Sequence, residues 1–305
     1  MIRTVIDIGS NSIKMRTARI YNNKVSIIHD ETEVVRLSRG MSSTGLLSPE
    51  SMKKSCDAVC RMIKHAKGDI FIAGTMALRT AKNADEFLKL VKDSTGLEVH
   101  VLSGIDEAKY SWLGAVDGFD LSGNIIMFDS GGGSTEFVSG NVAQGVEKVI
   151  SVPVGAVNLC EKFFNEHNKP FSKSSCDKAL EFVKNLFSEY DTASFSLINN
   201  NSHIIGVGGG VAAMSSVKNA CENFMPSKLH GSILTLRDIS LQIRIYASLT
   251  LSERENIIGL PASRADVILG SACIAYEALK VLNADKCIVS INGLRHGLLL
   301  REYEN

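Results

Sequence analysis

The sequence has no net charge, because 33 Lys and Arg residues balance 33 Asp and Glu residues among 305 positions. A polyanionic ligand must therefore be attracted by a local group of basic side chains, since the whole molecule has no field that favours it. Binding to DNA through phosphate neutralisation is not supported. The N-terminus has no signal-peptide pattern, and no apolar run approaches the length of a membrane span. We therefore expect a cytoplasmic protein that binds neither DNA nor a membrane.

Paired cysteines are also absent. The seven cysteines are scattered, with no C-x-x-C pair and no nearby histidine at the spacing of a zinc site. Free thiols in a reducing compartment explain them best. Low-complexity and linker-like segments are absent too, although 305 residues are enough for two domains of ordinary size. Any domain boundary must therefore be inferred from internal repetition.

The most informative stretch is 124–138, which reads N-I-I-M-F-D-S-G-G-G-S-T-E-F-V. Its apolar run predicts a buried strand that ends at Asp129. The three glycines that follow let the backbone turn and bring N–H groups close to an anion. Asp129 and Glu136, on either side of the turn, can hold a divalent cation against the phosphate that the turn binds. The alternative is a tight hairpin with glycines at its turn and no ligand.

The N-terminal segment 4–15, T-V-I-D-I-G-S-N-S-I-K-M, repeats this pattern. Asp7 follows an apolar strand, with Gly9 two residues later and Ser12 five residues later. A glycine and a serine stand at the same offsets from Asp129. A duplicated domain explains this match most economically, with two phosphate loops that face each other across a cleft.

Hydrophobic periodicity predicts that each half begins with a three-stranded antiparallel meander. Helices and short strands then alternate, so that the first half reads βββαβαβα. The pattern also predicts a loop over 74–81, an N-cap at Asn83, a capping box formed by Ser252 and Glu255, and a long helix over 264–282.

The internal repeat sets the expected domain boundaries. A first domain is expected over 1–120 and a second over 121–292. The terminal helix at 293–305 is a candidate to complete the first domain.

Further motifs accompany the two loops. They are D-I-G-S-N-S at 7–12, R-L-S-R-G at 36–40, T-M-A-L-R-T-A-K-N at 75–83, S-G-I-D-E-A at 103–108, D-S-G-G-G-S-T-E at 129–136, P-V-G-A-V at 153–157, R-A-D at 264–266 and G-L-R-H-G at 293–297. In this order they resemble the exopolyphosphatase / guanosine pentaphosphate phosphohydrolase (Ppx/GppA) family over essentially the whole chain. The resemblance implies an α/β fold of duplicated ribonuclease H-like domains, as in actin-like (ASKHA) ATPases. It also implies a short two-domain form without the C-terminal helical region of longer members.

The resemblance assigns roles to two charged residues. It places the family's water-activating glutamate at Glu107, although the residues alone make Asp106 and Glu107 simple first-turn acids of a helix. It also implies that Arg79 binds a phosphate of the substrate, since a guanidinium can bind a phosphate through two parallel hydrogen bonds. Without the family match, Arg79 would be read as a surface residue. Lys14 is expected to point to solvent or to the chain beyond it.

The remaining candidates fall into three groups. The residues expected to bind phosphate are Asp7, Gly9, Ser10, Asn11, Ser12, Arg79, Gly131, Gly132, Gly133, Ser134 and Thr135. The ligands expected for Mg²⁺, or another divalent cation, are Asp129 and Glu136. Candidates for a substrate channel are Gly208, Gly209, Arg264 and Arg295. Gly210 and His296 depart from the family's usual G-x-G-G-T and R-E-G, outside the predicted hydrolytic centre.

Together these features predict an enzyme that releases terminal orthophosphate from inorganic polyphosphate by metal-assisted attack of water. The alternative substrate is pppGpp, so that the partner is either polyphosphate or a guanosine penta- or tetraphosphate. Two functions of another class stay open: an actin-like kinase that uses ATP, and a non-catalytic sensor of polyphosphate or an alarmone. A homodimer is also left open.

Overall fold

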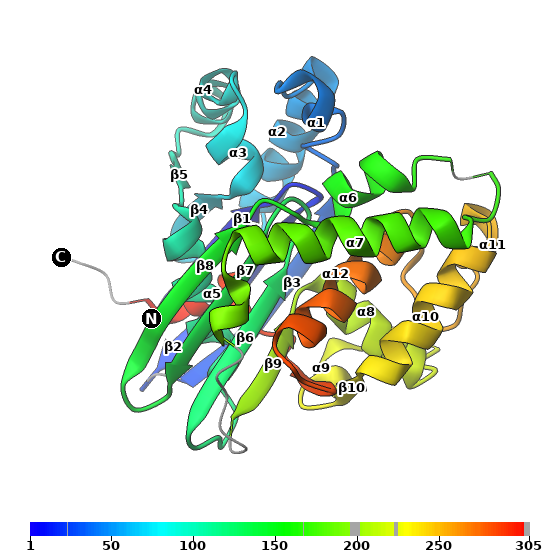
Figure 1. The fold of residues 1–305 in the computed structure, drawn as a ribbon. Coiled ribbons are helices and arrows are strands. Elements are labelled where there is room, and N and C mark those ends of the chain that lie inside the picture. Colours follow the sequence, from blue (N-terminus) through cyan, green and yellow to red (C-terminus); the bar gives the residue numbers. More distant parts are fainter. Residues whose placement is uncertain (23, 167, 196–201, 223–224, 302–305) are drawn as a thin grey trace. The chain divides into compact units, whose positions relative to one another are not determined.

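A computed structural model describes residues 1–22, 24–166, 168–195, 202–222 and 225–301 (Figure 1). The chain divides into two compact units, which we call the first unit (Met1–Gly114 with Gly293–Asn305) and the second unit (Ala115–Asn292). The division of the sequence into domains after residue 120 stays a prediction. No helix in the described ranges combines the length and the apolar character needed to cross a membrane. All seven cysteines are free thiols.

The first unit is built on a five-stranded sheet with the order β3-β2-β1-β4-β5. Its strands are β1 (Ile2–Ile8), β2 (Ser12–Tyr21), β3 (Lys24–Val34), β4 (Asp69–Gly74) and β5 (Val99–Val101). The first three form the predicted antiparallel meander, whereas β4 runs parallel to β1 and β5 parallel to β4.

Helices cover both faces of this sheet. They are α1 (Met41–Thr44), α2 (Pro49–Ile63), α3 (Met76–Thr80), α4 (Ala84–Thr95), α5 (Gly104–Val116) and α13 (Leu294–Leu300). Successive strand residues point to opposite faces, so Ile6 of β1 packs with α2 and α4, whereas Val5 packs with Leu298 of α13. The C-terminal helix thus belongs to the core of the first unit.

The second unit repeats the same topology with one strand added. Its sheet has the order β10-β11-β9-β6-β7-β8. The strands are β6 (Asn124–Ser130), β7 (Thr135–Asn141), β8 (Gly145–Val152), β9 (His203–Val207), β10 (Ile233–Thr235) and β11 (Lys286–Val289). Read from β8, the order matches that of the first sheet, and the additional strand β10 is antiparallel to β11. The predicted duplicated ribonuclease H-like α/β fold is therefore confirmed.

One apolar helix organises the packing of the second unit. The helices are α6 (Ala156–Phe163), α7 (Lys173–Glu189), α8 (Gly209–Lys218), α9 (Pro226–Leu229), α10 (Leu236–Ser248), α11 (Leu251–Arg254) and α12 (Ile268–Val281), with 3₁₀ turns at Thr192–Phe195 and Ala262–Arg264. Nearly every residue of α12 is buried, and α12 packs against α6, α7, α8 and α10 (Figure 1). A helix that is apolar on all sides must be enclosed in this way.

Several local predictions are wrong. Residues 74–81 are not a loop, because Met76–Thr80 form α3, a helix too short to show a periodic pattern. Asn83 does not cap α4. Its side chain accepts a hydrogen bond from Leu47 N (2.8 Å) and donates one to Leu47 O (3.0 Å). Both errors arise because the partner or the packing surface is remote in sequence.

Two further boundaries differ from the prediction. The capping box near α11 is formed by Thr250 and Glu253, two residues earlier than the predicted Ser252 and Glu255. The long helix begins at Ile268, after a 3₁₀ turn over Ala262–Arg264, and not at 264.

A cluster of charges, of which Arg16 is buried, ties α13 to the meander of the first unit. Asp30 of β3 accepts hydrogen bonds from Arg16 Nε (2.7 Å) and from Arg295 Nη1 (2.5 Å). The side chain of Arg16 is only 6% exposed. Desolvation opposes ionisation of Asp30, but the positive charges of Arg295 and Arg16 outweigh it and lower the pKa of Asp30. This stabilisation is present above the unfolded pKa of 3.8 and is lost as the pH falls through the folded pKa.

We therefore expect Asp30→Asn to destabilise the protein by about 2–3 kcal/mol at pH 7, because it leaves a buried arginine without its counter-charge. The matched control is Glu33→Gln on the same strand, whose partner Arg61 is 51% exposed. An exposed ion pair is worth about 1 kcal/mol or less. Urea unfolding at pH 7 measures both, and equal losses in the two variants would contradict this account.

Candidate functional site

Each of the two predicted loops contains the same kind of internal backbone hydrogen bond. In the first loop (9–12), Gly9 N donates to Ser12 O at 3.1 Å. In the second loop (131–134), Gly131 N donates to Ser134 O at 3.0 Å. Each loop joins the first two strands of its meander and directly follows the strand that carries Asp7 or Asp129. The sequence repeat is thus a repeat of geometry.

The carbonyl groups of the second loop accept hydrogen bonds from residues 156–158. Ala156 N donates to Gly131 O (3.0 Å), and Val157 N donates to Gly132 O (2.8 Å). The side chain of Asn158 donates to the third carbonyl, that of residue 133 (3.0 Å). In the described parts of the chain, the N–H groups of residues 132–134 donate to no protein acceptor. A row of backbone N–H groups without acceptors is suited to bind an anion.

This support depends on a close backbone approach at Gly155. A Cβ atom there would come within 2.3 Å of Gly133 N and 2.4 Å of Gly132 C. The P-V-G-A-V motif therefore needs glycine at its centre so that the start of α6 can lie against the loop.

The first loop is supported in the same manner by the segment that follows β3. Val35 N and Arg36 N both donate to Asn11 O (3.1 and 2.8 Å), and Ser38 N donates to Ser10 O (3.1 Å). Ser10, Asn11 and Ser12 are all buried. The R-L-S-R-G segment thus serves the first loop as P-V-G-A-V serves the second.

The residues opposite the two leading aspartates differ in charge. Asp129 is the direct cross-strand partner of Glu136, whereas Asp7 is the partner of Lys14. Lys14 Nζ lies 3.9 Å from Asp7 Oδ2 and the side chain is 28% exposed, so the expectation that Lys14 points to solvent or to the chain beyond it is wrong. Side chains directly opposite each other in antiparallel strands lie on one face within interaction distance. The first hairpin therefore neutralises its acid, whereas the second places two acids together.

Burial and a hydrogen bond hold Glu136, one of the two opposed acids of the second unit, in place. Glu136 is 2% exposed, and its Oε1 accepts a hydrogen bond from Ser151 Oγ at 2.8 Å. Thr135 contributes its hydroxyl to the backbone, since Oγ1 donates to Val154 O at 2.6 Å. Two carboxylates on one face of a sheet repel each other unless a cation or a proton lies between them.

The charged residues predicted in the first unit also come together. Arg79 of α3 donates from Nη1 to Glu107 Oε2 (2.9 Å) and to Leu102 O (2.8 Å). Its other guanidinium N–H groups donate to no acceptor in the described chain. Asp106 is occupied in another way, because its Oδ2 accepts from Ser103 Oγ (2.6 Å) at the start of α5. Only Glu107 is therefore joined to the predicted phosphate-binding arginine.

The glycine turn after β9 lies against the second loop's aspartate. Gly208 has φ +110°, and a Cβ atom there would lie 2.4 Å from Ser130 O and 3.3 Å from Asp129 Oδ1. A Cβ atom on Gly209 would lie 2.0 Å from Arg264 Nη2. The structure therefore brings Gly208 and Asp129 together, as well as Gly209 and Arg264.

The departures from the family pattern have local structural correlates. A Cβ atom on Gly210 would lie 2.4 Å from Ser271 Oγ, so the side chain of α12 fills this space. His296 is buried beside Arg16, with 3.4 Å between His296 Nδ1 and Arg16 Nη1. Arg295 is ion-paired with Asp30.

Sequence reasoning missed the residues that support the loops. Lys14 was discounted, although its offset of seven from Asp7 equals that of Glu136 from Asp129 and could have revealed the asymmetry. Asn158 and Ser151 carried no signal, because their partners lie 25 and 15 positions away in the chain.

Comparison with known proteins bears on this arrangement. The sequence profile of the Ppx/GppA phosphatase family matches residues 17–305. The chain belongs to this family.

Curated Ppx/GppA relatives carry different names. A "Bifunctional 3-dehydroquinate synthase/phosphatase" of Fusobacterium nucleatum is 32% identical over the whole of this chain, which covers 47% of that protein. A "Guanosine-5'-triphosphate,3'-diphosphate pyrophosphatase" of Photobacterium profundum is 27% identical, with 96% of this chain and 58% of the relative covered. "Exopolyphosphatase 2" of Mycobacterium tuberculosis H37Rv is 26% identical, with 96% and 95% covered. The chain thus spans about half the length of the first two relatives.

Solved Ppx/GppA structures share the fold. The Aquifex aeolicus PPX-GPPA enzyme is 30% identical, with a TM-score of 0.80 and 99% of each chain covered. An exopolyphosphatase-like protein at 24% identity, with a TM-score of 0.88, shows the fold alone.

The environment of Asp7 leads to a prediction on stability. Asp7 is 6% exposed, and its Oδ1 has no hydrogen-bond partner in the described chain. Desolvation raises the pKa of Asp7 in spite of the charges on Lys14 and Arg295. A raised carboxyl pKa means that ionisation costs stability as the pH rises above the unfolded value of 3.8.

We expect Asp7→Asn to raise the melting temperature at pH 7, because it removes a buried charge with an unmatched oxygen. The gain should shrink as the pH falls towards 3.8 and vanish below it, where Asp7 itself is neutral in both states. Thermal unfolding of both proteins between pH 3.5 and 8 checks this. A variant that is less stable at pH 7 would show that the carboxylate is favourable in the fold.

Proposed function

We propose that the protein hydrolyses terminal phosphoanhydride bonds and releases orthophosphate from inorganic polyphosphate, with pppGpp as the alternative substrate. The observation that carries the proposal is the second loop, whose carbonyls are engaged and whose N–H groups lie beside the opposed Asp129 and Glu136. The names of the relatives differ in substrate but share the removal of phosphate. Polyphosphate and pppGpp both end in a phosphoanhydride, which is the feature that such a loop binds.

In the proposed reaction, a water oxygen forms a bond to the terminal phosphorus while the bridging P–O bond breaks. The shortened chain leaves on the bridging oxygen, and the water proton passes to a carboxylate. We assign that carboxylate to Glu107. Asp106 is less suited to the task, because it is engaged with Ser103 at the start of its own helix.

The developing negative charge is assigned to backbone donors of the second loop and to one arginine side chain. The backbone N–H groups of residues 132–134 would bind phosphate oxygens through preorganised donors. Arg79 would bind a phosphate through the guanidinium N–H groups that donate to no acceptor in the described ranges. Because Arg79 also holds Glu107 at 2.9 Å, it would orient the base as well as the substrate.

Mg²⁺ is the proposed cofactor, and the carboxylates of Asp129 and Glu136 are its proposed ligands. Opposed acids of which one is buried fit a hard divalent cation, which prefers oxygen ligands. When bound, Mg²⁺ would neutralise charge on the phosphate oxygens. The first hairpin does not fit a cation, because Lys14 already neutralises Asp7.

Each of the two rival functions would require a specific further property. A kinase would need a nucleotide site near the glycines at 206–210, where the guanidinium of Arg264 lies against Gly209. A sensor would need binding without turnover. The location in the cytoplasm and a homodimer stay predictions from the sequence.

We expect Glu107→Gln to lower phosphate release from polyphosphate by about a hundredfold to ten-thousandfold, since it removes the proton acceptor. Binding of polyphosphate should be retained, because the amide keeps the size of the side chain. Asp106→Asn is the matched control and should keep turnover within about threefold of wild type. Phosphate release from long-chain polyphosphate and from pppGpp, with Mg²⁺ and with chelator, ranks the two substrates.

Equal turnover in Glu107→Gln and wild type would overturn the assignment of the base. Binding without release by the wild-type protein would favour the sensor. Transfer of phosphate from ATP to a small acceptor would favour the kinase.

We expect Glu136→Gln to raise the Mg²⁺ concentration for half-maximal activity by about tenfold or more, since it removes a ligand charge. Glu147→Gln is the control, because Glu147 is an exposed acid of the same sheet. Activity titrated with Mg²⁺ measures the shift. An unchanged Mg²⁺ requirement in Glu136→Gln would place the cation elsewhere.

A further inference from the structure

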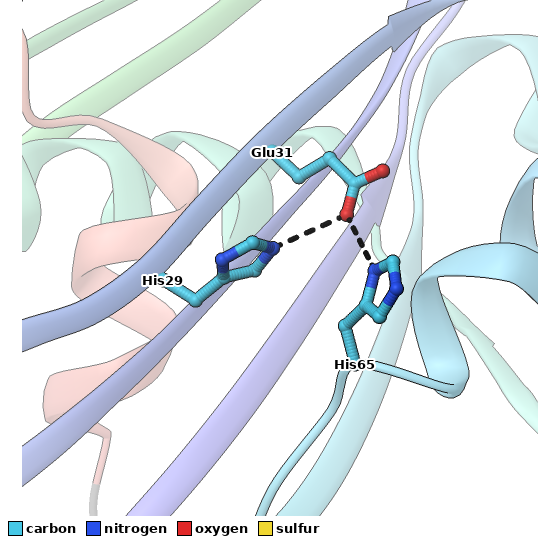
Figure 2. Close-up of side chains that lie close together, drawn as sticks. All are labelled: His29, Glu31 and His65. Atoms are coloured by element: carbon cyan, nitrogen blue, oxygen red, sulfur yellow. Dashed lines mark hydrogen bonds and ion pairs between the residues drawn. The ribbon is translucent and has the colours of Figure 1, made fainter.

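Two histidines and a glutamate of the first unit lie close together, and none of them belongs to the loop at 9–12. His29 and Glu31 are alternate residues of β3 and so share one face of the sheet, while His65 lies in the turn that follows α2. Figure 2 shows both imidazole rings directed at the same carboxylate oxygen. We call these three residues the His–Glu–His cluster.

The distances within the cluster suit metal ligands better than hydrogen bonds. Glu31 Oε2 lies 3.3 Å from His29 Nε2 and 3.3 Å from His65 Nδ1, and the three atoms all lie within 4.8 Å of one another. A charge-assisted N–H···O bond is about 2.7–2.9 Å long. Two ligands at about 2.0–2.1 Å from one tetrahedral Zn²⁺ are about 3.3–3.4 Å apart. Small rotations of partly exposed side chains can complete this geometry.

The donor set selects a class of cation. Imidazole nitrogens with one carboxylate suit Zn²⁺, Ni²⁺ or Cu²⁺, whereas Mg²⁺ prefers oxygen ligands throughout. The side chains of His29, Glu31 and His65 are 42%, 30% and 59% exposed, so a cation can enter from solvent and keep a water ligand. The next acid on the same face, Glu33, is paired with Arg61 at 2.6 Å. Three protein ligands are therefore available.

We propose that His29, Glu31 and His65 bind one transition-metal cation of the Zn²⁺ class, at a site separate from the Mg²⁺ ligands assigned to the second unit. The cation would fasten β3 to the end of α2. In the part of the chain that the structure describes, β3 is an edge strand and pairs with β2 alone. The metal link would therefore attach β3 to the sheet's neighbouring helix as well.

Calorimetric titration of the metal-stripped full chain with Zn²⁺, in constant millimolar Mg²⁺, tests the proposal. We expect one Zn²⁺ per chain, with the affinity lowered at least tenfold in His29→Ala and in His65→Ala. His100→Ala is the matched control, because His100 is an exposed histidine of β5 in the same sheet, and its affinity should equal that of wild type. Zn²⁺ should raise the melting temperature of wild type and His100→Ala, but not of His65→Ala.

Competing thiols require a separate readout, because Cys60 and Cys221 are only partly buried. Titration with Co²⁺ distinguishes them, since thiolate ligation adds a charge-transfer band in the near ultraviolet that nitrogen and oxygen ligands lack. We expect no such band. The proposal would be overturned by a sulfur band, by unchanged affinity in both histidine variants, or by Zn²⁺ binding that is lost only in Glu136→Gln.

Discussion

The fold of each unit depends on how one tight turn is held after its first strand. Gly9 and Gly131 each donate to the serine three residues ahead, and a later segment then binds the loop's carbonyl groups from behind. The carbonyl oxygens of the loop accept hydrogen bonds from the rest of the protein. The loop therefore presents its N–H groups to a ligand, and their partial positive charge suits phosphate. The close approach at Gly155 and the backbone bonds to Ser10 and Asn11 serve this purpose. Four of the eight motifs that carry the family resemblance lie in these loops or in the segments that support them.

Duplication made two such loops, and they differ in the charge that faces the leading aspartate. Seven residues after the leading aspartate, the first hairpin has Lys14 and the second has Glu136. The first therefore carries its own counter-charge, whereas the second places two acids opposite each other, and the proposed Mg²⁺ site rests on that arrangement. This difference in charge distinguishes the loop that we propose to bind phosphate alone from the loop that we propose to hold a metal as well. The cost of burial is visible at Asp7, where desolvation raises the carboxyl pKa in spite of the lysine.

Strong periodic patterns made most of the fold predictable. Both meanders formed as predicted, and the terminal helix lies within the predicted 293–305. The errors share a cause. α3 is too short to show a period, and Asn83 turns away from its own helix to bind Leu47, 36 positions earlier. Local pattern cannot report a partner that only folding brings near.

The same limit separates what the sequence determined about function from what the tertiary structure decided. Sequence determined the family, the duplicated fold and the two loops, because glycines, leading acids and strand periodicity are local features that repeat along the chain. Tertiary structure alone decided which acid is joined to Arg79, that Lys14 neutralises Asp7, and that His65 meets Glu31 across 34 positions. Charge and ligand geometry act over a few ångströms in space, and the chain order of the residues involved does not encode those distances.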